Sequence, residues 1–133
     1  MKYSFIVTGS LPIIRVREGY TTVIQIPAAD WDLTDSVRCR WASSAGAAGD
    51  ECGDICQNLP NANLSKRSVI FPMIHVIRCI FSNSDCTITW TAVRRPYDII
   101  FGRLSSTYVV AIMVEDFVNS ISTIPMSSVP LQM

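Results

Sequence analysis

The sequence predicts an all-β fold, an antiparallel β-sandwich of about seven strands. Strand-like runs rich in β-branched and aromatic residues recur between turn signals along most of the chain. These runs occupy residues 3–8, 12–17, 21–26, 36–42, 86–92, 106–115 and 127–131. In one run Val37, Cys39 and Trp41 alternate with polar residues, and residues 86–91 alternate in the same way. Such alternation is typical of strands with one face in a core.

The most informative run is residues 108–117, which we interpret as one strand of the sandwich. Alternate residues from Tyr108 to Val114 form one apolar face, which we expect to lie in the core. The strand ends on two adjacent carboxylates, Glu115 and Asp116. Adjacent residues of a strand point to opposite faces, so this pair is poorly placed for shared acid–base chemistry.

Size and composition favour one globular domain, residues 1–133. Eleven basic and eleven acidic residues cancel, so no broad field attracts nucleic acid or an anionic membrane. No apolar run approaches the roughly 20 residues of a membrane span. The apolar stretch within residues 1–10 is shorter than a secretory leader requires. We expect it to be the end of a preceding segment of a longer secreted protein.

Three stretches depart from this strand rhythm. Residues 43–63 are small and polar, which predicts a long connection. Residues 66–85 contain a nearly continuous apolar run without a clear period, and residues 93–104 fit the pattern no better. We interpret the last two stretches as atypical insertions.

The chain has five cysteines: Cys39, Cys52, Cys56, Cys79 and Cys86. Four of them could form two disulfides, which would indicate an oxidising compartment. Cys39 and Cys86 both lie on inward faces and are natural partners for a core bridge, while Cys52 and Cys56 could close a local loop. Pairings between the strands and the loop are equally allowed. Cys79 is then left as a free or intermolecular thiol.

A glycosylation sequon begins at Asn63, followed by Leu64 and Ser65. An N-linked glycan at Asn63 agrees with a secreted location. The alternative for the cysteines is that all five are reduced and buried in a cytosolic protein.

A series of motifs also carries a family resemblance. In order they are residues 11–16, 24–27, 30–35, 37–42, 51–56, 86–90, 108–117 and 125–132. This series resembles a family of repeated extracellular modules in large secreted or cell-surface proteins of invertebrate animals. More broadly it is similar to immunoglobulin-like sandwiches of the cadherin and PKD type. The resemblance covers most of the chain except residues 66–85 and 93–104. It implies an immunoglobulin-like sandwich with a structural or adhesive role and no known catalysis.

Carboxylates near two strand ends form a candidate calcium site: Asp30, Asp32, Asp35, Glu115 and Asp116. Calcium takes six to eight oxygen ligands, and Asp-x-Asp spacing lets two side chains converge from one loop. The alternative is that these aspartates cap turns. In the family that this chain resembles, the sequence Asp-x-Asp-Gly-Asp is common at this position, whereas this chain has Leu33 and Thr34 in place of the glycine. Calcium is the one cofactor that we expect, if there is any.

A rival metal site would use the spacing Cys52-x3-Cys56 together with His75-x3-Cys79, which is compatible with a Cys3His zinc centre. Such a centre would make the domain intracellular. We find no nucleophile motif, no phosphate-binding glycine loop and no catalytic partner for His75 in the sequence.

The sequence therefore predicts a non-catalytic extracellular module, one repeat of a larger structural or adhesive protein. Its partners would be neighbouring domains of the same chain or other extracellular proteins, with no nucleic acid. One alternative is a self-assembling subunit that completes an edge by β-strand addition. The others are the zinc-binding domain and a carbohydrate-binding sandwich that uses Trp31.

Overall fold

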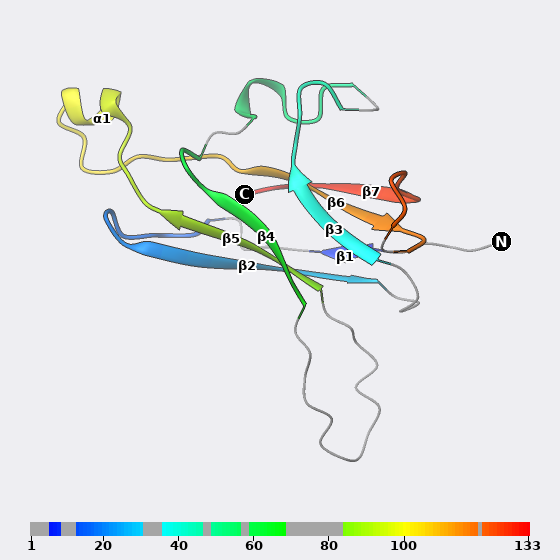
Figure 1. Ribbon diagram of the computed structural model, residues 1–133. Helices are drawn as coiled ribbons and strands as arrows, with labels where there is room; N and C mark the ends of the chain where they lie inside the picture. Colours follow the sequence, from blue (N-terminus) through cyan, green and yellow to red (C-terminus); the bar gives the residue numbers. More distant parts are fainter. Residues whose placement is uncertain are drawn as a thin grey trace, which may run out of the picture.

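The computed structural model describes residues 6–8, 13–30, 36–46, 49–56, 59–68, 84–119 and 121–133. In these segments the chain forms two antiparallel sheets that pack as a sandwich (Figure 1). The strands are β1 (Ile6–Thr8), β2 (Thr21–Asp30), β3 (Ser36–Trp41), β4 (Asn63–Ser68), β5 (Ser84–Thr91), β6 (Ala111–Phe117) and β7 (Ser127–Gln132). Two short helices, η1 (Gly53–Ile55) and α1 (Pro96–Ile100), lie in connections. The prediction of an all-β sandwich is confirmed.

The number of substantial strands differs slightly from the prediction. We expected about seven, but β1 has only three residues, so six longer strands form most of the sandwich. One sheet has the order β1-β2-β5-β4 and the other β3-β6-β7. Taken in chain order, this is the arrangement of the two sheets in constant-type immunoglobulin sandwiches.

The strand registers define two ends of the sandwich. Thr21 of β2 pairs with Thr91 of β5, and α1 follows directly after β5. We call this end, where β2 and β6 begin, the α1 pole (Figure 1). At the far pole Ser36 of β3 pairs with Phe117 of β6, and the connection from β6 to β7 turns back.

The core lies between the sheets because each sheet turns an apolar face inward. Ile26 and Ile88 of one sheet and Ile112 and Val114 of the other are all fully buried. Val110 joins them, and Tyr108 packs against their edge. The predicted core face of residues 108–114 is therefore confirmed, although β6 itself begins only at Ala111.

The outer face of β6 is also covered, which explains its almost continuous apolar sequence. Ala111 and Met113 pack against Ala42 and Cys52 in a second, smaller cluster. The connection from β3 to β4, which carries η1, folds back over this face. Every residue of β6 is consequently buried.

Two strand assignments from the sequence are wrong. Residues 13–17 alternate in exposure as a strand would, but they pair with neither sheet. Conversely, β4 was not predicted, because its sequence NLSKRS is polar and gives no apolar pattern. It is a strand because it pairs with β5 over six positions, from Asn63 opposite Thr89 to Ser68 opposite Ser84.

The two expected insertions have different outcomes. The ends of residues 66–85 belong to β4 and β5, while residues 69–83, with His75 and Cys79, lie outside the described residues. Residues 93–104 form α1 and its flanking turns, which project from the α1 pole (Figure 1). None of the helices in the described segments has the length and apolar character that crossing a membrane requires.

Candidate functional site

Only some of the residues predicted to bind calcium lie in the described part of the chain. Asp32 and Asp35 lie outside the described residues, and Asp30 ends β2 with a side chain that is also outside them. Glu115 and Asp116 follow each other in β6 and therefore point to opposite faces of its sheet. Asp116 is fully buried on the same face as Val114, whereas Glu115 faces outward. The structure does not bring these two side chains together.

Glu115 has an arginine partner on the outer face of its sheet. Nε of Arg40 donates to Oε1 of Glu115 at 2.9 Å, and a second guanidinium nitrogen lies 2.8 Å from the same oxygen. Arg40 also donates to both carboxylate oxygens of Glu51, at 2.6 and 2.7 Å. The guanidinium thus joins β3, β6 and the η1 connection in one network.

This network shifts the pKa of two side chains, Glu51 and Arg40. Hydrogen bonds from Arg40 and from the backbone N–H of Ser43 lower the pKa of Glu51 to about 2. Hydrogen bonds to Glu51 and Glu115 raise the pKa of Arg40 further above its usual value. Glu51 and Arg40 therefore stay ionised at neutral pH. They fasten the η1 connection to the sheet, and we assign them a structural role.

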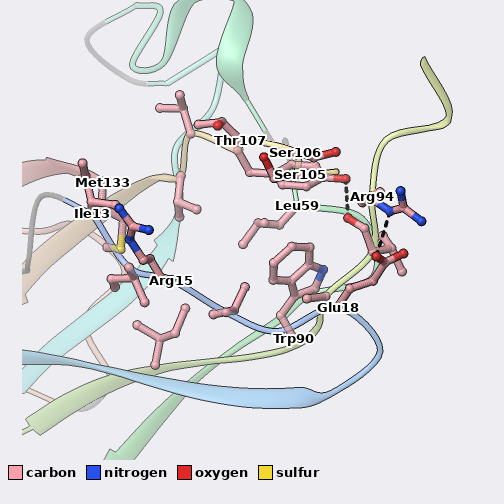
Figure 2. A pocket seen from close by; sticks show the side chains of 18 of the residues that line it. Ile13, Arg15, Glu18, Leu59, Trp90, Arg94, Ser105, Ser106, Thr107 and Met133 are labelled. Atoms are coloured by element: carbon pink, nitrogen blue, oxygen red, sulfur yellow. Dashed lines mark hydrogen bonds and ion pairs between the residues drawn. The ribbon is translucent and has the colours of Figure 1, made fainter. Parts of the chain in front are cut away.

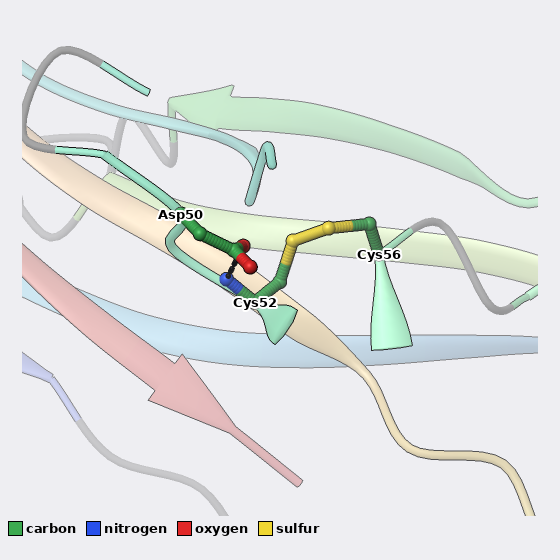
Figure 3. Close-up of side chains that lie close together, drawn as sticks. All are labelled: Asp50, Cys52 and Cys56. Carbon is green, nitrogen blue, oxygen red and sulfur yellow. Dashed lines mark hydrogen bonds between the residues drawn. A yellow bond between two sulfur atoms is a disulfide. The ribbon is translucent and has the colours of Figure 1, made fainter. Parts of the chain in front are cut away.

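The predicted zinc ligands Cys52 and Cys56 are occupied by a disulfide (Figure 3). Asp50 lies close enough to their sulfurs for the three groups to resemble a metal site. However, bonded sulfurs are not thiolate ligands. Oδ1 of Asp50 accepts the backbone N–H groups of Cys52 and Gly53, at 3.1 and 2.9 Å. The carboxylate therefore accepts backbone N–H groups just before and at the start of η1.

The second disulfide crosses the core. It joins Cys39 of β3 to Cys86 of β5, with their Cα atoms 6.0 Å apart, and so links the two sheets. The sequence had left the pairing of the cysteines open. Among the alternatives, Cys39–Cys86 and Cys52–Cys56 are the pairs that the structure contains.

The sequon lies on an accessible edge of the sandwich. Asn63 is the first residue of β4, which pairs with β5 and forms an edge of its sheet. Asn63 and Ser65 are both exposed, and their spacing places them on one face of the strand. This position is open to a glycosylating enzyme.

A cavity of about 680 Å³ opens at the α1 pole (Figure 2). Its floor is apolar and includes Ile24, Leu59 and Trp90, and its rim carries Ser105, Ser106 and Thr107. Arg94 and Glu18 close one side through an ion pair of 2.7 Å. A cavity of this size and lining suits an apolar group with a polar end.

The aromatic residues of this cavity are fixed by hydrogen bonds. Nε1 of Trp90 donates to the carbonyl of Pro60 at 3.0 Å, and the hydroxyl of Tyr108 donates to the carbonyl of Val93 at 3.0 Å. The two rings meet edge to face, with centroids 5.1 Å apart. Because these groups hold the ends of β4, β5 and β6 in place, the cavity has a defined wall.

The connection from β5 to β6 has a polar interior that the sequence did not reveal. Asp98 is buried, and its carboxylate accepts from the hydroxyl of Ser106 at 2.6 Å and from Arg103 at 3.2 Å. The hydrogen bond from Ser106, and the nearby Arg103, lower the pKa of Asp98. The same Ser106 hydroxyl accepts the backbone N–H of Arg95 at 2.8 Å. The connection is thereby held in one shape.

Comparison with protein-family models, with curated protein sequences and with solved structures finds no match to this chain. The fold and the two bridges define it as a disulfide-linked all-β sandwich. The resemblance to extracellular repeat modules stays a prediction.

Proposed function

We propose that this chain is a non-catalytic structural or adhesive module of an extracellular protein. The observation that carries the proposal is the disulfide between Cys39 and Cys86, which links the two sheets inside the core. Disulfides form and persist in oxidising compartments and are rare in the cytosol. The local Cys52–Cys56 bridge and the exposed sequon at Asn63 agree with the same setting.

The path of the chain through the sandwich supports a role as one link of a series. Ile6 of β1 pairs with Asp30 at the end of β2, so the chain enters the sandwich at the far pole. Gln132 of β7 pairs with Ala111 at the start of β6, so the chain leaves β7 at the α1 pole. Entry and exit at opposite poles allow successive modules to be joined end to end as a spacer.

Two of the three alternative functions gain little from the structure, and Trp31, which the carbohydrate-binding alternative would use, lies outside the described residues. The self-assembling alternative assumed an incomplete last strand, but β7 pairs with β6 over six positions, although it remains the outer strand of its sheet. A Cys3His zinc centre would need Cys52 and Cys56 as thiolates, and these two are bonded to each other.

The proposal is tested by producing the chain in two ways, secreted by animal cells behind a leader peptide and kept reduced in the cytosol. We expect the secreted form to be a monomer by light scattering and to unfold at a clearly higher temperature than the reduced form. Equal melting temperatures would remove the need for an oxidising compartment. A stable oligomer would favour the self-assembling subunit.

A further inference from the structure

Large apolar side chains gather at the tip of the connection between β5 and β6. They are exposed in spite of their size: Tyr97, Ile99, Ile100, Phe101 and Leu104. Ile100 is 79% exposed and Leu104 93% exposed. We call these five residues the apolar tip. Exposed groups of large apolar side chains often mark a surface that meets a protein or a membrane.

This connection buries a polar side chain and exposes apolar ones, the reverse of the usual distribution. The buried side chain is the carboxylate of Asp98, held by Ser106 and Arg103, while the apolar residues on either side point to solvent. The rings of Tyr97 and Phe101 pack on each other with centroids 4.4 Å apart, but both remain largely exposed. If burial of apolar surface alone determined the shape of this loop, its isoleucines would be buried and its aspartate exposed. The hydrogen bonds instead hold the apolar tip outward.

The two segments next to the apolar tip carry a net positive charge although the whole chain is neutral. The tip's own connection and the neighbouring residues 13–20 contain five arginines and two carboxylates: Arg15, Arg17, Arg94, Arg95, Arg103, Glu18 and Asp98. Gly19 and Tyr20 are hydrogen-bonded to Ala92, which places the two segments side by side. Even with Glu18 and Asp98 neutralising two arginines, these two segments keep a net positive charge.

We propose that the apolar tip docks on the surface of an anionic lipid bilayer. Ile99, Ile100 and Leu104 enter the boundary between headgroups and acyl chains, and the arginines meet the lipid phosphates and carboxylates. Apolar residues that project beyond adjacent basic segments match the layering of a bilayer surface, and tyrosine is favoured at headgroup level. An acidic protein would match the arginines but not a convex apolar projection. The inference does not depend on the adhesive role.

Vesicle co-sedimentation tests the proposal on the intact, oxidised chain. We expect it to sediment with phosphatidylcholine vesicles that contain roughly a third phosphatidylserine, and much less with phosphatidylcholine alone. Raising the salt concentration weakens binding, because the Debye length shortens. The double variant Ile100→Ser/Leu104→Ser loses at least about tenfold in binding, since two apolar side chains no longer leave water.

A matched control lies at the far pole. Ile121 and Ile124, in the connection from β6 to β7, are 86% and 77% exposed, and Ile121→Ser/Ile124→Ser removes the same kind of surface. We expect this variant to bind as the native chain does. The proposal is overturned if neither vesicle binds the native chain, or if the two variants lose binding equally. A concentration-dependent dimer that only Ile100→Ser/Leu104→Ser abolishes would also overturn it, because a second copy would then cover the tip.

Discussion

The two disulfides predict a measurable difference in stability because they close loops of very different length. Cys39 and Cys86 are 47 positions apart, whereas Cys52 and Cys56 are 4 positions apart. In the loop-entropy description these bridges stabilise the fold by about 4 and about 2 kcal/mol. We therefore expect Cys39→Ala/Cys86→Ala to destabilise the chain by about 2 kcal/mol more than Cys52→Ala/Cys56→Ala.

Packing adds a loss of similar kind to both double variants. Cys86 is buried beside Ile26 and Ile88 in the core, and its replacement by alanine also removes a buried sulfur. Cys52 is buried in the smaller cluster against Ala111 and Met113, and the partners Cys39 and Cys56 are both half-buried. The expected gap between the two double variants therefore comes mainly from loop length.

The assay is guanidinium unfolding of both double variants and the native chain, followed by tryptophan fluorescence. A linear fit gives the free energy of unfolding of each, and equal slopes show that unfolding exposes similar surface. Equal losses from the two double variants, or a larger loss from Cys52→Ala/Cys56→Ala, would refute the reasoning.

Three further predictions concern single side chains. The pKa of Glu51 is lowered from 4.5 to about 2 in the folded chain, so its ionised form stabilises the fold above pH 4.5 and this contribution is lost as the pH falls towards 2. In Glu51→Gln the melting temperature should fall less steeply as the pH drops across that range. Near neutral pH the substitution should lower the free energy of unfolding by only about 1 kcal/mol, because Arg40 is partly exposed and its charge is screened by solvent. An unchanged acid profile would contradict this prediction. Asn63→Gln should abolish the mass shift that a glycan-removing enzyme produces in the secreted chain, without changing its melting temperature, and a native chain that carries no glycan would count against the site. Asp98→Asn should speed tryptic cleavage after Arg103, because the charged acceptor that holds this connection is weakened; unchanged cleavage would show that the carboxylate does not hold it.

The sequence predicts the strands that have one buried face. Val37, Cys39 and Trp41 alternate with arginines because β3 has the core on one side and a largely polar surface on the other. The same pattern makes Cys39 and Cys86 face each other. Such elements are predictable because each residue's environment follows from its position along the strand.

Elements whose environment depends on distant partners could not be predicted. The polar β4 is a strand only because its backbone pairs with β5. Residues 13–17 alternate in exposure, but they pair with no strand of the two sheets. Arg40 and Glu51 meet because the η1 connection folds back over β6, which no local pattern indicates. The prediction that Glu115 is a metal ligand at a strand end has the same origin. Its arginine partner lies on another strand, so the sequence near Glu115 does not show that the carboxylate is paired.

The most direct test of the central claim is a disulfide map of the secreted chain, made by mass spectrometry of peptides cut without reduction. The account predicts two bridges, Cys39–Cys86 and Cys52–Cys56, which leave Cys79 as the remaining thiol of the five cysteines. Free thiols at Cys52 and Cys56 with bound zinc would contradict it. A bridge from Cys39 to either of them would contradict it as well, because the two sheets would then not be joined through the core.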